Sequence, residues 1–177
     1  MKEMRMAMDL DPLSVVYYWD LGNELLMAKR YDDALSLLAK ANELFPNFPI
    51  LRWETAEAYY QKGDHEASER VIEALKSAHP EMEKDPTYLA LLGYAAGRAG
   101  RRDEARQILD RVEQAHRRQY VEPVMVLGLC LSVGDRVAFR RWLSRARDER
   151  SAFFLYAPLA THLYNDDPEA KAFFARR

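Results

Sequence analysis

The stretch VVYYWDLGNELLMAKRYDDALSLLAKANELFP, residues 15–46, decides the fold of this 177-residue chain. Its apolar residues recur three or four positions apart, which is the spacing of one face of an α-helix. The leucines that carry this pattern are Leu21, Leu25, Leu35 and Leu38. Pro46 closes the stretch, and we expect it to end the second of two helices because proline lacks an N–H and clashes with the preceding turn.

Small residues occupy both predicted helices at matching places. Gly22 lies inside the first helix, where glycine costs about 1 kcal/mol of helix stability relative to alanine. We expect glycine there because a partner helix comes close to the backbone, and we expect Ala34 at the matching point of the second helix. The stretch therefore predicts two closely packed helices.

The offsets between these residues define a repeating unit. After Leu21-Gly22 come the following positions: Leu25, Ala34, Leu38, Ala41 and Pro46. This pattern resembles the tetratricopeptide repeat, a 34-residue helix–turn–helix unit. The resemblance implies an all-α chain, a right-handed α-solenoid of helix–turn–helix repeats, and a binding surface rather than an enzyme.

The unit recurs along the chain at nearly constant spacing. Repeats are predicted to start at residues 15, 49, 86 and 120, and stacked units explain so regular a period. In the fourth repeat the glycine of the first helix is shifted by one position, to Gly128. We expect one domain divided into a partial repeat or cap at 1–14, repeats at 15–48, 49–85, 86–119 and 120–150, and capping helices at 151–177.

Both ends depart from the repeat. The first residues match the end of a second helix whose first helix is missing, which predicts either a solitary cap or a piece of a longer protein. Beyond the fourth repeat we expect two short helices, 159–164 and 169–176, to cover its apolar end. The run GDRVAFRRWLSRARDERS at 134–151, with Asp167-Pro168 after it, is similar to the end of repeat domains in bacterial signalling proteins and transcription regulators.

The composition of the sequence limits the cellular compartments in which we expect the protein. No apolar run is long enough to span a membrane. The start, MKEMRMAMDLDP, is too charged for a secretory signal. Cys130 is the single cysteine, so no internal disulfide forms, and we expect a buried, inert thiol. We expect a cytoplasmic protein without membrane contact.

Charge is distributed unevenly along the chain. Residues 1–97 contain 10 Lys and Arg against 17 Asp and Glu, whereas residues 98–150 contain 13 against 8. Solvated helix faces account for most such runs. Self-association between the acidic and basic halves, or an acidic partner, is the alternative. Nucleic acid is a weaker alternative: Arg136, Arg140 and Arg147 share a helix side, but no recognition motif accompanies them.

Motifs for catalysis and metal binding are absent from the sequence. There is no H-E-x-x-H, paired-cysteine, phosphate-loop or G-x-S-x-G pattern. The adjacent acids Asp32-Asp33 and Asp166-Asp167 are expected at helix starts, where the helix dipole favours negative charge. The histidines fall mostly at predicted turns or helix ends: His65, His79, His116 and His162. We therefore expect neither an enzyme nor a cofactor.

The resemblance implies that the first helix of each repeat lines a concave groove. The candidate peptide-binding residues carried onto this chain are Trp19, Asn23, Met27, Trp53, Glu57, Tyr60, Tyr94 and Arg98. Trp, Tyr and Arg dominate binding energy at interfaces. We expect the aromatic members to form one wall, and for Trp53 in particular the alternative is packing between helices.

A known binding mode of this family is a clamp of Lys, Arg and Asn around the terminal carboxylate of a chaperone peptide. Here only Asn23 matches the clamp, and Glu57 would repel a carboxylate. We therefore do not expect a chaperone tail. The predicted function is a scaffold that binds a protein or peptide in the groove. The alternative is a regulatory segment of a larger bacterial transcription regulator or cyclase.

Overall fold

The computed structural model describes residues 6, 11, 13–151 and 168. Within these residues the regular structure is entirely helical, and no strand occurs. The chain divides into two compact units, Met1–His79 and Pro80–Arg177. The prediction of an all-α fold built from helix–turn–helix repeats is confirmed.

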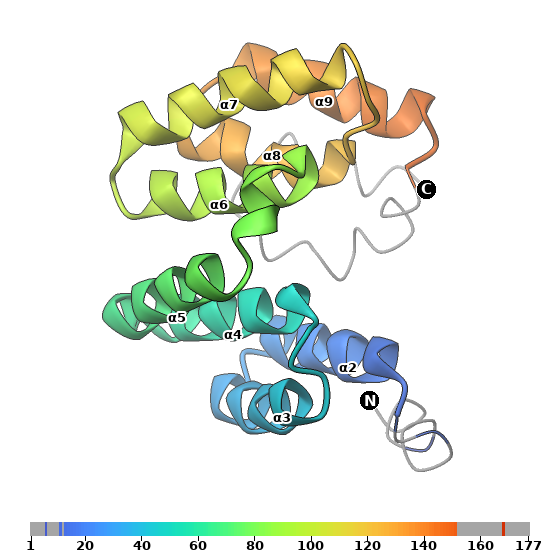
Figure 1. The fold of residues 1–177 in the computed structure, drawn as a ribbon, viewed down its shortest axis with the longest axis vertical. Helices are drawn as coiled ribbons and strands as arrows, with labels where there is room; N and C mark the ends of the chain where they lie inside the picture. The colour runs from blue at the N-terminus through green and yellow to red at the C-terminus, as the bar shows by residue number, and fades with distance from the viewer. Residues whose placement is uncertain (1–5, 7–10, 12, 152–167, 169–177) are drawn as a thin grey trace. The chain divides into compact units, whose positions relative to one another are not determined.

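The first unit contains two helix pairs. The first pair is α2 (Val15–Met27) and α3 (Tyr31–Leu44), and the second is α4 (Pro49–Lys62) and α5 (His65–Ala78). Within this unit α3 packs against both α2 and α4 (Figure 1). Its core consists of small and branched apolar side chains, among them Leu21, Leu25, Ala34, Leu38, Ala41 and Leu51.

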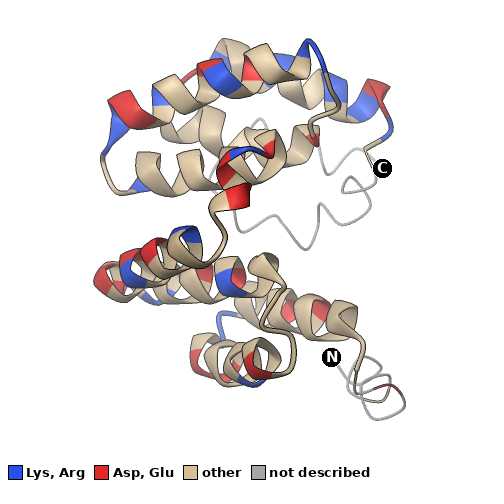
Figure 2. Ribbon diagram, viewed as in Figure 1, with Lys and Arg blue, Asp and Glu red and all other residues tan. Residues whose placement is uncertain are grey.

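The second unit also contains two helix pairs, preceded by the 3-10 helix η1 (Pro80–Glu83). The pairs are α6 (Pro86–Arg98) with α7 (Arg102–His116), and α8 (Pro123–Ser132) with α9 (Arg136–Asp148). Helix α8 contains no charged residue, and it packs on α6, α7 and α9 (Figure 2). Its nearly complete burial explains why its sequence, PVMVLGLCLS, shows no polar face.

Helix starts agree with the predicted repeat starts in three of four places. Helices α2, α4 and α6 begin at residues 15, 49 and 86, whereas α8 begins at Pro123, three residues after the predicted start. The carboxylate of Glu122 accepts a hydrogen bond from the Val124 N–H and caps this helix. Proline at the first position of a helix loses no hydrogen bond, so Pro123 suits the first position of α8.

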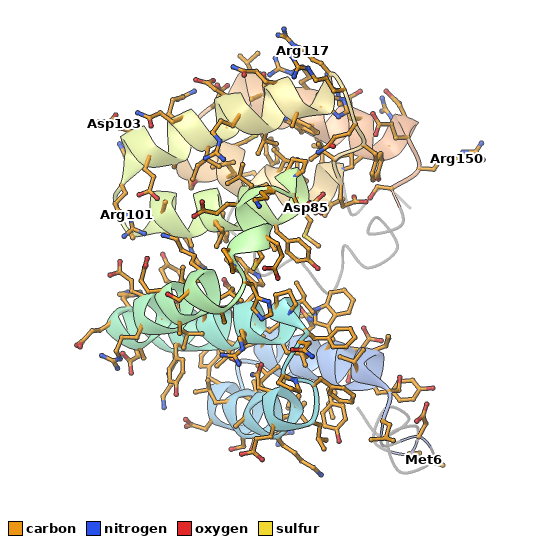
Figure 3. All side chains as sticks on the ribbon, viewed as in Figure 1. Met6, Asp85, Arg101, Asp103, Arg117 and Arg150 are labelled. Carbon is orange, nitrogen blue, oxygen red and sulfur yellow. The ribbon has the colours of Figure 1, made fainter. Side chains whose placement is uncertain are left out.

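Acidic side chains stand at helix starts, as expected. Asp32 and Asp33 lie in the first turn of α3. Helix α7 has Asp103 in its first turn and Arg117 just beyond its last residue, so both ends match the helix dipole (Figure 3). Asp166-Asp167 and the helices expected at 159–164 and 169–176 lie outside the described residues, as does His162.

The turn between the two helices of each repeat contains one residue in the left-handed backbone conformation. In three repeats this residue is glycine, with φ of 92° at Gly63, 81° at Gly100 and 76° at Gly134. In the first repeat the same place is taken by Lys29, with φ of 57°. The left-handed conformation is strained for a residue with a Cβ, so Lys29 departs from the pattern that the other repeats follow.

Glycines inside helices lie where a neighbouring helix comes close. The expected pairing of Gly22 with Ala34, however, is wrong. A Cβ added to Gly22 would lie 3.3 Å from Leu38 of α3, and Ala34 is not among the atoms within reach. In the second unit a Cβ on Gly97 would lie 2.5 Å from the Cβ of Ser132. Helices α6 and α8 therefore approach more closely than α2 and α3 do.

A buried carboxylate connects three segments of the second unit. Glu122 accepts hydrogen bonds from the hydroxyls of Ser151 and Tyr120, the latter at 2.8 Å. Its own N–H donates to the Thr87 hydroxyl at 3.3 Å. These contacts join the start of α6, the start of α8 and the residue that follows α9 and its turn.

Candidate interaction surface

The first helices of the two repeats in the first unit are joined by a polar contact between one predicted site residue, Trp19, and one residue that sequence reasoning missed, Glu54. The indole N–H of Trp19 on α2 donates to Oε1 of Glu54 on α4 at 3.0 Å. Glu54 is buried, with 4% of its surface exposed, and Trp19 is half-buried. The bond fixes the orientation of the Trp19 ring. The signal that could have identified Glu54 is the indole N–H of Trp19, which needs a hydrogen-bond acceptor.

Asn23 lies one turn after Trp19 on the same helix. Its side-chain amide donates to the backbone carbonyl of Trp19 at 3.0 Å, and the residue is 3% exposed. Met27 follows after another turn and is 42% exposed. Residues four apart share one helix face, so these three predicted site residues lie along one side of α2, and their exposure increases towards Met27.

The predicted site residues on α4 differ in accessibility. Trp53 and Glu57 are buried, at 2% and 1% exposure. The carboxylate of Glu57 accepts a hydrogen bond from Gln61 at 3.0 Å. Tyr60 is half-buried, and its ring lies 4.7 Å from that of His65, centroid to centroid. Of these three residues, only Tyr60 offers part of its side chain to the outside.

The predicted site residues of the second unit contact each other. The guanidinium carbon of Arg98 lies 4.4 Å from the centroid of the Tyr94 ring, which is a cation–π contact. Tyr94 is 8% exposed and Arg98 is half-buried. The ring of Tyr94 also packs on Gly128 of α8, the glycine that is shifted by one position in the fourth repeat.

Carboxylates crowd the α2 face. Burial raises the pKa of Asp20 above its ordinary value, and the nearby charge of Glu24 raises it further. Glu54 and Glu57 add two buried carboxylates from α4. That Glu57 would repel a carboxylate ligand stays a prediction.

The next side chains are those that could hold a metal ion or act as a nucleophile. No group of three or more His, Cys, Asp or Glu side chains there is arranged to hold a metal ion. Cys130 is buried, as predicted, and burial raises the pKa of its thiol to about 12. Three of the four histidines stand at helix ends: His65, His79 and His116.

None of the described helices combines the length and the apolar character that crossing a membrane requires.

Several arginines of the basic half are already paired within the second unit. Their exposed or partly exposed ion pairs are Arg106 with Asp135, Arg141 with Glu113, and Arg147 with Asp148. These pairs reduce the positive charge that remains for an outside partner.

Comparison with known families agrees with the geometry. Two tetratricopeptide-repeat family models match the chain, one over residues 25–95 and the other over residues 86–111. Curated proteins were also compared, and none matched. The matched range does not reach the run at 134–151, so the similarity of that run to bacterial signalling proteins stays a prediction. The two matches find tetratricopeptide repeats between residues 25 and 111, where the structure has helix pairs.

Proposed function

We propose that the chain is a non-catalytic scaffold that binds a protein or peptide on the first helices of its repeats. Tetratricopeptide repeats are generally protein–protein interaction modules, and the family is typically non-catalytic. The proposed binding residues are Trp19, Asn23, Met27, Trp53, Glu57, Tyr60, Tyr94 and Arg98. Their burial supports different roles for different members.

The hydrogen bond between Trp19 and Glu54 is the observation that carries the proposal. It holds a large, half-buried aromatic side chain in one orientation between α2 and α4. A side chain that is already fixed loses little conformational entropy when a partner packs on it. Met27, on the same face, is exposed and flexible, and methionine adapts its shape to a partner.

The buried residues among the proposed binding residues stabilise the surface from beneath. Asn23, Trp53 and Glu57 are almost inaccessible, so they hold the shape and charge of the first-unit surface. In the second unit Tyr94 positions Arg98 in the same way. Because carboxylates line the α2 face, the proposal favours a neutral or basic segment over an acidic one in the first unit.

Site-specific photo-crosslinking tests the proposal. A photoreactive amino acid replaces Met27, and a matched control replaces Val137 on α9, which is 70% exposed. We expect a discrete adduct in the source cell from position 27 and none from position 137. Trp19→Ala should weaken the adduct strongly, and Trp19→Phe should weaken it less because the ring remains. Equal adducts from both positions, or an adduct that Trp19→Ala leaves unchanged, would contradict the proposal.

The second candidate is a regulatory segment of a larger bacterial transcription regulator or cyclase. It is supported by the sequence of 134–151 alone, which is similar to the end of repeat domains in such proteins. The coding sequence upstream in the same reading frame tests it. A winged-helix or cyclase domain there supports this candidate, and an unrelated reading frame removes it.

Self-association through the acidic and basic halves stays a separate prediction. It predicts a molar mass above the monomer in sedimentation at low salt, falling to the monomer at high salt because screening weakens exposed charge contacts. A monomer at low salt would contradict it.

A further inference from the structure

His116 and Trp142 connect the second helices of the two repeats in the second unit. His116 is the last residue of α7, and Trp142 lies in the middle of α9. Their ring centroids are 4.9 Å apart, and the rings meet edge to face. Trp142 is fully buried, whereas His116 is half-buried. The imidazole is therefore part of the packing that holds α7 against α9.

Two ring nitrogens of this pair are buried and have no hydrogen-bond partner among the described residues. They are Nδ1 of His116 and Nε1 of Trp142. A neutral imidazole carries an N–H on one nitrogen, whereas the protonated ring carries an N–H on both. Protonation of His116 would thus place a charged donor at Nδ1, where it has no acceptor. A buried donor without an acceptor is costly, and more so when it is charged.

Cations surround the same end of the helix pair. The guanidinium carbon of Arg145 lies 4.7 Å from the centroid of the Trp142 ring, which is a cation–π contact. An imidazolium at position 116 would be a second cation close to this ring, and a nearby like charge disfavours the charged form. Arg117 and Arg118 follow directly in the chain, but both are exposed, and solvent screens exposed charges.

Acidic groups and the helix end act in the opposite direction. Glu149 after α9 and Glu113 on α7 both favour protonation of His116. The helix dipole at the end of α7 also favours a cation. Glu113, however, is already paired with Arg141 of α9. Burial is the strongest influence and Arg145 is the next, so the pKa of His116 is lowered from its ordinary value.

We propose that His116 is a proton-sensitive contact: its neutral ring holds the C-terminal half of α9 against α7, and its protonated ring releases it. The start of α9 is held separately, because Arg106 of α7 pairs with Asp135 at 2.8 Å. Release is therefore confined to the end of α9 that contains Trp142 and Arg145. None of these residues belongs to the surface proposed above for the partner protein.

The direction of the pH dependence follows from the lowered pKa. A histidine whose pKa is lowered by folding binds fewer protons in the folded chain than in the unfolded chain. The contribution of His116 to stability is therefore present above the unfolded pKa, about 6.5, and is lost as the pH falls below that value towards the folded pKa. This range lies above the one in which a carboxylate such as Asp135 takes up its proton.

An NMR titration of the full chain, labelled with nitrogen-15, tests the contact between about pH 8 and about pH 5. We expect His116 to titrate at a lower pH in the folded chain than in urea. The indole N–H signal of Trp142 should shift with the same midpoint. Amide signals of residues 142–148 should shift or broaden over this range, and those at the start of α9 should not. The indole signals of Trp19 and Trp53 are internal controls and should not follow this midpoint.

Substitutions should move the titration in opposite directions. Arg145→Gln removes a neighbouring cation and should raise the pKa of His116, whereas Glu149→Gln removes a neighbouring anion and should lower it. His116→Gln does not titrate, so the fall of the urea midpoint between about pH 7 and about pH 5 should be largely lost. The matched control His65→Gln replaces an exposed histidine of α5 and should leave that fall intact.

Four outcomes would overturn the proposal. The first is a pKa of His116 that is equal or higher in the folded chain than in urea. The second is a Trp142 indole signal that does not move while His116 titrates. The third is a fall of the urea midpoint that His116→Gln and His65→Gln change equally. The fourth is a shift of the titration in the same direction by Arg145→Gln and Glu149→Gln, which decides the question even if His116→Gln does not fold.

Discussion

The ring of Tyr94 on α6 packs on the backbone of Gly128 on α8. A methyl group at position 128 would lie 3.2 Å from two carbons of that ring. Arg98 contacts the same ring through its guanidinium, at 4.4 Å. Tyr94 therefore acts as a packing residue between two repeats of the second unit, and it positions Arg98.

This relationship predicts how substitutions at Tyr94 behave. Tyr94→Phe keeps the ring and should change the free energy of unfolding by less than about 1 kcal/mol, whereas Tyr94→Ala should lower it by about 3–5 kcal/mol. Urea denaturation followed by circular dichroism measures both. A small effect of Tyr94→Ala would mean that the ring contributes little to packing.

Gly97 and Gly22 should respond oppositely to alanine. Alanine gains about 1 kcal/mol of helix stability at either place. At position 97 its methyl group would lie 2.5 Å from the fixed Cβ of Ser132, and overpacking of this kind costs about 1–3 kcal/mol. At position 22 it would meet the movable side chain of Leu38 at 3.3 Å.

We therefore expect Gly97→Ala to lower the urea midpoint and Gly22→Ala to leave it unchanged or raise it. The double variant Gly97→Ala with Ser132→Gly should recover part of the loss, because it removes the colliding Cβ. An increase of the midpoint with Gly97→Ala alone would show that α6 and α8 can separate at little cost.

The helix pairs are the part of the fold that the sequence predicts well. Apolar spacing and the prolines predicted the helix pairs, because both act through local backbone chemistry. The burial of Glu57 was not predicted, and that of Trp53 was one of two alternatives. A repeat position specifies the helix face and not the side chains that cover it. The partner of Gly22 was missed for the same reason: the spacing gave two close helices, and only coordinates show that Leu38 fills the contact.

The candidate surface was less accessible to sequence reasoning. The Trp19–Glu54 bond joins residues 35 apart, and no local pattern reports such a pair.

Lys29 gives a prediction of increased stability. It holds φ of 57° where the other three repeats have glycine. The left-handed conformation costs about 1 kcal/mol or more for a residue with a Cβ. Lys29→Gly should therefore raise the free energy of unfolding of the first unit, after a smaller entropic loss is subtracted. Lys40→Gly, inside α3, is the control and should lower it by about 1 kcal/mol. Losses at both positions would contradict the strain argument.

Asp135 should make the second unit sensitive to acid. Its carboxylate accepts a hydrogen bond from the Ala138 N–H at 2.9 Å, which together with Arg106 at 2.8 Å holds its pKa below the ordinary value. A group with a lowered folded pKa stabilises the fold above its unfolded pKa, about 3.9. That contribution is lost as the pH falls through the lower folded pKa.

Asp135→Ala should therefore lower the free energy of unfolding by about 1 kcal/mol at neutral pH. The difference from the unaltered chain should shrink below about pH 4. Asp135→Asn keeps a capping oxygen and should lose less at neutral pH. Urea denaturation at several pH values measures these differences, and a difference that stays constant down to pH 2 would rule out the carboxylate as its source.

Cys130 should report on unfolding. Burial raises the pKa of its thiol to about 12, and none of its surface is exposed. The thiolate is the reactive form, so a disulfide reagent at pH 8 should label the folded chain slowly and the urea-unfolded chain at once. The labelling rate should rise with urea in parallel with the loss of helix. Complete labelling of the folded chain within seconds would place Cys130 at the surface.

The Glu122 carboxylate has a practical consequence for anyone who expresses part of this chain. A shortened protein that stops at Arg150 retains all of α9 but loses the Ser151 hydroxyl that donates to this carboxylate. Its interior would then contain a carboxyl group with one hydrogen-bond donor fewer. Truncation boundaries drawn at the last helical residue would therefore yield a weaker second unit than boundaries drawn a few positions later.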